Sequence, residues 1–187
     1  MSCTLISLDQ SGCIKPFGGL VQSYAVSYDD IEDITFSSPN TVTGITLDGA
    51  ATLAKYQYAK DDSAYYNQEG SLNGSINVFE QESMFKFLGI NEENQEFVYN
   101  VTGCCNLILI HVTNTGTILM QGVEYDDDTE EWRLAKNSTK FSGNINTGTS
   151  DEESAVEAIF TSQAFFPSPI VDMTIDALDV LAGESGG

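Results

Sequence analysis

The 187 residues are enough for one domain with a sizeable core, and their charge is strongly one-sided. Aspartate and glutamate number 28 against 7 lysines and arginines, which gives a formal net charge of -21 at pH 7. Such a chain should repel nucleic acid, which argues against a nucleic-acid-binding protein. We expect a single, well-solvated domain.

Export and membrane signals are missing from the sequence. The start lacks the charged and apolar regions of a signal peptide, and no run of about 18 apolar residues could form a spanning helix. The four cysteines, Cys3, Cys13, Cys104 and Cys105, do not have the spacing of a zinc site. We therefore expect a soluble protein with free thiols, and a Cys3 to Cys13 disulfide is the alternative.

The clearest structural signal is a pair of apolar runs separated by a short polar break. Residues 107–112 are followed by the break at 113–116 and by a second run over 118–125. Asn114 and Gly116 suit the positive-φ positions of a tight turn, so we predict a β-hairpin. Because both faces of the first run are apolar, it should be a central strand covered on both sides.

The residues before this hairpin are predicted to be mostly β. Residues 1–19 form an N-terminal arm, and Ile31 and Ile34 suggest a helical turn. Asn91 has the character of an N-cap and starts the one clearly predicted helix, which ends at Gly103. Strands are expected over 20–28, 41–47, 52–60, 66–79 and 80–89, with 52–60 and 66–79 paired as a long hairpin.

After the central hairpin the pattern predicts further short strands. An acidic turn covers 126–131, followed by strands over 132–136 and 154–166 with a polar region between them. Residues 170–187 alternate apolar and acidic positions, which suggests a strap or a short amphipathic helix before a flexible tail. The domain itself is thus predicted to cover 20–169.

No catalytic or cofactor motif stands out. His111 is the only histidine and lies in an apolar strand, so a core or interface role is expected. The acidic turn at 126–131 lacks the central glycine and the bidentate glutamate of a calcium loop. Phosphate-binding glycine loops and metalloprotease motifs are also missing. We predict a protein that is not an enzyme and needs neither metal nor cofactor.

Several segments in a fixed order carry a resemblance to a known family. They are the start with Cys3 and Cys13 before Leu20, the segments 43–60 and 63–82, the helix after Asn91, the central hairpin, and the closing strand 164–170. In this order they resemble the tail tube (major tail) proteins of phages that infect Bacteroidota.

The resemblance implies a mainly β, single-domain antiparallel β-sandwich or barrel with one flanking α-helix. It implies a structural virion protein that assembles as hexameric rings, which stack into a tail tube for DNA passage. Its partners would be further copies, other phage tail proteins and viral DNA that passes without specific binding, with no membrane insertion. It would be made in the host bacterial cytoplasm and reside in the virion tail. The alternative is a capsid decoration or head-tail joining protein.

Two sets of candidate residues follow from this interpretation. The polar face of the long alternating strand is the candidate channel wall: Ser71, Asn73, Ser75 and Asn77. Aromatic residues on strands are candidates for inter-subunit contacts, with core packing as the alternative; they are Tyr56, Tyr58, Tyr65, Tyr66 and Trp132.

Overall fold

The computed structural model describes most of the chain from residue 19 onward. Residues 1–18 of the arm predicted over 1–19, with Cys3 and Cys13, lie outside the described residues, as does Ser75. The described residues are 19–38, 40–58, 64–74, 76–102, 106–126, 128–135, 140–146 and 154–184.

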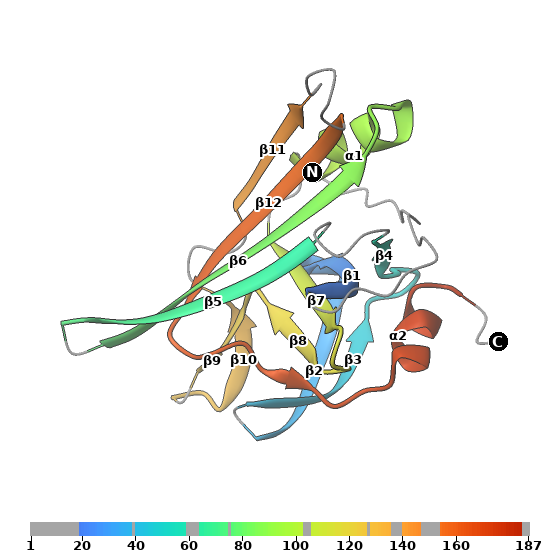
Figure 1. Cartoon of the computed structure of the whole chain (residues 1–187). Helices are drawn as coiled ribbons and strands as arrows, with labels where there is room; N and C mark the ends of the chain where they lie inside the picture. The colour runs from blue at the N-terminus through green and yellow to red at the C-terminus, as the bar shows by residue number, and fades with distance from the viewer. Residues whose placement is uncertain are drawn as a thin grey trace.

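Strands form three sheets, and the pairing is antiparallel except between β13 and β3 (Figure 1). The seven-stranded sheet has the spatial order β2 (Ile31–Ser38), β3 (Thr41–Leu47), β13 (Ile170–Val171), β8 (Ile118–Gln121), β7 (Leu107–Thr113), β1 (Leu20–Ser27) and β4 (Ala54–Gln57). The four-stranded sheet has the order β11 (Lys140–Asn146), β12 (Ala155–Ala164), β6 (Ile76–Leu88) and β5 (Ala64–Asn73). A two-stranded sheet pairs β10 (Glu131–Leu134) with β9 (Val123–Asp126).

The helical content is small and lies at the margins of the sheets. It comprises a 3-10 turn η1 (Tyr28–Asp30) and two α-helices, α1 (Glu92–Thr102) and α2 (Ile175–Leu181). The mainly β, mostly antiparallel prediction is confirmed, but the described strands form no closed barrel. Beside the flanking helix α1, the C-terminal segment forms α2, the short helix that the sequence left open as an alternative to a strap.

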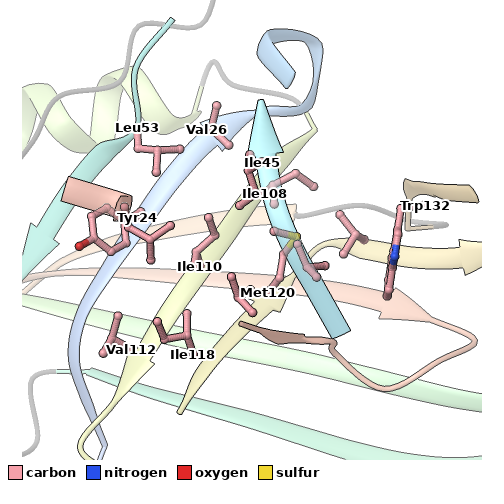
Figure 2. Close-up of a cluster of buried hydrophobic side chains, with 14 of the residues drawn as sticks. Tyr24, Val26, Ile45, Leu53, Ile108, Ile110, Val112, Ile118, Met120 and Trp132 are labelled. Carbon is pink, nitrogen blue, oxygen red and sulfur yellow. The ribbon is translucent and has the colours of Figure 1, made fainter. Parts of the chain in front are cut away.

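Strand β7 lies between two apolar cores and contributes to both, as its sequence predicts. Leu107 and Leu109 belong to the core between the seven-stranded and four-stranded sheets, where Phe85, Phe87 and Phe160 are fully buried. The alternate side chains of β7 belong to a second core on the other face of the seven-stranded sheet (Figure 2). That core contains Tyr24, Val26, Ile108, Ile110, Val112, Met120 and Trp132, among others.

Helix α1 begins where the sequence places it. The side-chain oxygen of Asn91 accepts a hydrogen bond from the backbone N–H of Asn94 at 2.7 Å, and Glu92 and Glu93 lie in the first turn near the positive end of the helix dipole. Phe97 is fully buried in the core between the sheets. The predicted N-cap and apolar stripe are both confirmed.

The strand predicted over 66–79 is wrong, because the chain reverses in the middle of it. Strand β5 ends at Asn73, Gly74 adopts a φ of 68°, and β6 runs back from Ile76. This left-handed conformation suits glycine. The hairpin predicted between 52–60 and 66–79 is also wrong. The two segments do not pair with each other, since β4 pairs with β1 and β5 pairs with β6.

The helical turn predicted around Ile31 and Ile34 is also wrong. Those residues lie in β2, and the helical turn η1 comes just before them. The register between β2 and β3 shifts between Ile31 and Asp33, so both isoleucines can pack against the second core without a helix. The i, i+3 spacing of these two isoleucines therefore arises from an irregular strand and not from a helical turn.

The C-terminal segment is built into the sheet and fastened by ion pairs of the buried Lys55 with two partly exposed carboxylates. Strand β13 lies between β3 and β8, and Leu178 of α2 is fully buried in the second core. Lys55 of β4 lies 2.8 Å from Asp179 and 2.7 Å from Glu184. Burial opposes the charge of Lys55, but hydrogen bonds to the two carboxylates outweigh it and raise the pKa of Lys55.

The core between the two large sheets gives a direct stability prediction. Phe85→Ala should lower the free energy of unfolding by about 3–5 kcal/mol, because the ring is fully buried against Tyr58 and Phe160 and leaves a cavity. Urea unfolding followed by circular dichroism measures this change. Tyr99→Ala, at a side chain that is 80% exposed, is the control and should stay within about 0.5 kcal/mol. Equal effects of the two substitutions would contradict the assignment of this core.

Candidate functional site: an acidic sheet face and an exposed hairpin

The outer face of the four-stranded sheet is polar and acidic. Side chains along β6 alternate, so that Phe85 and Phe87 enter the core while Glu80 and Glu82 point to the other face. Polar residues of β5 and β12 stand directly opposite these two glutamates in the strand register. They surround a hollow of about 400 Å³ lined by Asn67, Glu69, Glu80, Gln81, Glu82, Thr161, Ser162 and Gln163.

Carboxylates gather around the hollow on this face, while Lys86 lies further along β6 on the same face, directly opposite Glu157. Glu69 of β5 is directly opposite Glu80 of β6, a placement in which like charges repel each other. Tyr65 donates a hydrogen bond of 2.6 Å to Glu82, and this bond raises the pKa of Tyr65. The residues lining the hollow include three glutamates and neither lysine nor arginine. The face therefore has the charge sign of a nucleic-acid backbone.

The β5–β6 hairpin extends past the four-stranded sheet as an exposed arm (Figure 1). Strand β12 pairs with β6 only from Phe79 onward, so residues 71–78 have no neighbouring strand from β12. Leu72 and Ile76, near the turn, are 70% and 56% exposed. No residue from Gly70 to Phe79 is charged.

The four predicted channel-wall residues lie on this arm and do not share one face. Ser71 and Asn73 are opposite Val78 and Ile76 in the register, while Asn77 is opposite Leu72 and hence on the other face. The reversal at Gly74 separates them, and Ser75 lies outside the described residues.

The predicted contact aromatics differ widely in exposure. Tyr56 and Tyr58 are buried in the core between the sheets, and Trp132 is 8% exposed and packs edge-on against Tyr125. These three have little surface to offer a second subunit, because packing within the monomer covers them. Tyr65 is 37% exposed and keeps contact area.

Tyr66, the remaining aromatic candidate, covers the histidine. Its ring lies 5.1 Å from the imidazole of His111, and its hydroxyl is 2.6 Å from the Ser168 hydroxyl. Burial raises the pKa of Tyr66 to about 12. The side chain therefore closes the core above His111, with part of its surface still exposed.

A layer of buried polar side chains, which the sequence analysis missed, connects the two large sheets. The two ring nitrogens of His111 on β7 lie 2.9 Å from the Ser23 hydroxyl and 2.9 Å from the Gln121 side-chain oxygen. Ser83 on β6 donates to the same Gln121 oxygen at 2.8 Å. Because His111 and Gln121 belong to one sheet and Ser83 to the other, the bonds cross the core.

The same layer continues along β6 and β12. The Gln121 amide is 3.3 Å from the backbone oxygen of Gln81 and 3.3 Å from the Ser162 hydroxyl, and Ser162 donates to the Gln81 side-chain oxygen at 2.9 Å. The side-chain nitrogen of Gln81 is buried without a hydrogen-bond partner. His111 is completely buried with both ring nitrogens bonded, which favours an internal structural role.

Metal and membrane sites were tested on the described part of the chain. There, no three histidine, cysteine, aspartate or glutamate side chains come together in a way that could hold a metal ion. None of its helices is long and apolar enough to cross a membrane. In the acidic turn, Arg133 binds Glu124 at 2.9 Å and Asp126 at 2.6 Å.

Comparison with known proteins adds no identification. No family model, curated protein or solved structure matches this chain.

The buried histidine predicts a pH dependence of stability. Burial lowers the pKa of His111 from 6.5 to about 4, so the unfolded chain takes up this proton at a higher pH than the native protein does. The stability contributed by neutral His111 should be complete above pH 6.5 and fall by roughly 3 kcal/mol as the pH drops to about 4.

Urea titrations of the wild type and His111→Gln between pH 7.5 and 5 test this expectation. The carboxylates are common to both proteins, so their contribution cancels in the difference between the two unfolding free energies. That difference should change steadily below pH 6.5 in favour of the variant. A difference independent of pH would mean that His111 titrates normally in the folded protein.

Proposed function

We propose that this protein is a structural virion subunit that assembles into rings and stacks as a phage tail tube. The single observation that supports it best is the acidic outer face of the four-stranded sheet, whose two edge strands are open. In the proposed assembly this face lines the channel, and Glu69, Glu80 and Glu82 replace the wall residues predicted from sequence. In this proposal the subunit is a tail-tube-like sandwich without enzymatic activity.

Open strand edges give the subunit a way to assemble. In the described part of the chain, β5 pairs only with β6 and β11 pairs only with β12, so each presents unpaired backbone groups. Exposed edges favour pairing with another chain. Joining β5 of one copy to β11 of the next would close the sheets into a ring and remove both edges.

The dimensions of such a ring suit DNA passage. Six copies of a four-stranded sheet supply about 24 strands, which at ~4.8 Å spacing and ~40° tilt close a barrel about 48 Å wide between backbones. Inward side chains would narrow this opening but leave room for a duplex. The estimate supports six-fold rings without fixing the number of copies.

The charge of the wall would serve the same purpose. A surface binds DNA in proportion to the phosphates that its cations neutralise. The hollow on the sheet face has three glutamates and no cation in its lining. DNA would therefore meet a repelling surface and slide without being retained.

Electron microscopy and light scattering of the purified protein across a range of salt concentrations test this function. Wild-type protein should form rings or hollow tubes once salt screens the repulsion between acidic faces. The triple variant Glu69→Gln, Glu80→Gln, Glu82→Gln should assemble below about 0.1 M salt, where the wild type does not, because at that ionic strength screening acts only beyond ~10 Å.

A matched control neutralises three exposed glutamates away from the sheet face: Glu32→Gln, Glu96→Gln and Glu130→Gln. Its salt requirement should stay close to that of the wild type if repulsion on the wall is decisive. Particles that remain monomeric at high salt and high concentration would reject the tube and favour a decoration or head-tail joining protein, which binds a preformed shell.

A further inference from the structure

We propose that the uncharged tip of the β5–β6 hairpin of one copy inserts Leu72 into a carboxylate-free pocket beside the β7–β8 turn of a neighbouring copy. The inference rests on the proposed tube function and assigns the contact that holds neighbouring copies together. The tip supplies an apolar side chain, and the pocket supplies the surface that receives it.

The hairpin tip has the properties of a docking element. Leu72 and Ile76 flank the turn at Gly74 on opposite faces of the hairpin, and they are the most exposed large aliphatic side chains described in the four-stranded sheet. Between Glu69 and Glu80 the chain has no charge. An uncharged tip approaches an acidic protein without adding like-charge repulsion, and contact would remove the Leu72 side chain from water.

The receiving pocket is the hollow whose lining best matches this tip. It measures about 300 Å³, and its lining residues are Gly19, Leu20, Tyr66, Thr113, Asn114, Thr115 and Leu119. A backbone hydrogen bond of 3.2 Å from Asn114 to Gly19 holds its two walls together. Neither a carboxylate nor a cation lines it.

The other described hollows are less suited to an apolar tip. The one between β2 and β10 is lined by Glu32, Asp33 and Glu131, and the one beside α1 by Glu92 and Glu96. The hollow on the sheet face is also lined by carboxylates. Chemical matching therefore selects the pocket beside the β7–β8 turn.

The tip and the pocket of one copy are too far apart to meet. Tyr66, in the pocket wall, and Leu72, at the tip, lie on the same strand β5 and are separated by six residues, or ~20 Å of extended chain. Only a second copy can bring a tip to the pocket. Since the two surfaces differ, the contact is heterologous. Its repetition from copy to copy builds either a closed ring or a stack of rings.

Site-specific photocrosslinking locates the contact in assembled protein. A benzoylphenylalanine introduced in place of Leu72 is irradiated in assemblies made from equal amounts of ¹⁵N-labelled and unlabelled full-length protein. Mass spectrometry should find crosslinks to residues 113–119 or to Leu20, and these should join labelled to unlabelled chains. Crosslinks to the β2–β10 hollow, to residues 1–18, to the α1 hollow or within one copy would overturn the proposal.

Substitutions on both sides of the contact provide the second readout. Leu72→Asp should raise the protein concentration needed for assembly about tenfold or more while leaving the monomer fold unchanged by circular dichroism. Thr115→Arg, on the exposed rim of the pocket, should have a similar effect. Val180→Asp, at a 60% exposed position on α2, is the control and should assemble like the wild type.

The outcomes separate this inference from the function on which it rests. If the wild type forms no rings or tubes under any salt condition, the proposed function fails. If the wild type assembles and Leu72→Asp assembles equally well, the tube stands and the proposed contact is wrong. Loss of assembly in Leu72→Asp and Thr115→Arg but not in Val180→Asp supports both the tube function and the proposed contact.

Discussion

The fold depends on strand β7 being covered on both faces. Its side chains alternate between two apolar cores, so each face of the seven-stranded sheet must be shielded from water. The four-stranded sheet and α1 shield one face, while α2 and the β9–β10 pair contribute to the other (Figure 1). The outer face of the four-stranded sheet is left to water, and there the carboxylates gather. One buried strand thus determines which sheet face is left to water.

Buried hydrogen bonds fix how the two large sheets are placed relative to each other. Apolar contacts tolerate sliding, but the bonds among His111, Gln121 and Ser83 have defined directions and cross the core. A shift of β6 by one residue would break these bonds and turn its phenylalanines outward. The same constraint orients the β5–β6 arm, because β6 is continuous from the polar layer to Ile76.

Local patterns were predicted well and spatial partners poorly. The β7–β8 hairpin and the Asn91 cap depend on neighbouring residues, so the sequence contains them. The turn at Gly74 was missed because Leu72, Gly74 and Ile76 keep a period of two in the sequence, although the reversal puts Leu72 and Ile76 on opposite faces of the hairpin. The alternation also assigned Tyr56 to one face of a strand, but it did not show which residues of other strands cover that face. The polar layer was missed because Gln121 and Ser83 occupy inward positions that a pattern assigns to apolar residues.

Acidity restricts how copies of this chain can hold together. Salt bridges between subunits need cations, and the chain has 7 lysines and arginines against 28 carboxylates. Lys55 is already bound to Asp179 and Glu184, and Arg133 to two carboxylates of β9. The proposed assembly would then draw mainly on contacts that involve no charge, namely backbone pairing at open edges and apolar burial. The hairpin tip and the pocket beside the β7–β8 turn are two uncharged places on this acidic chain.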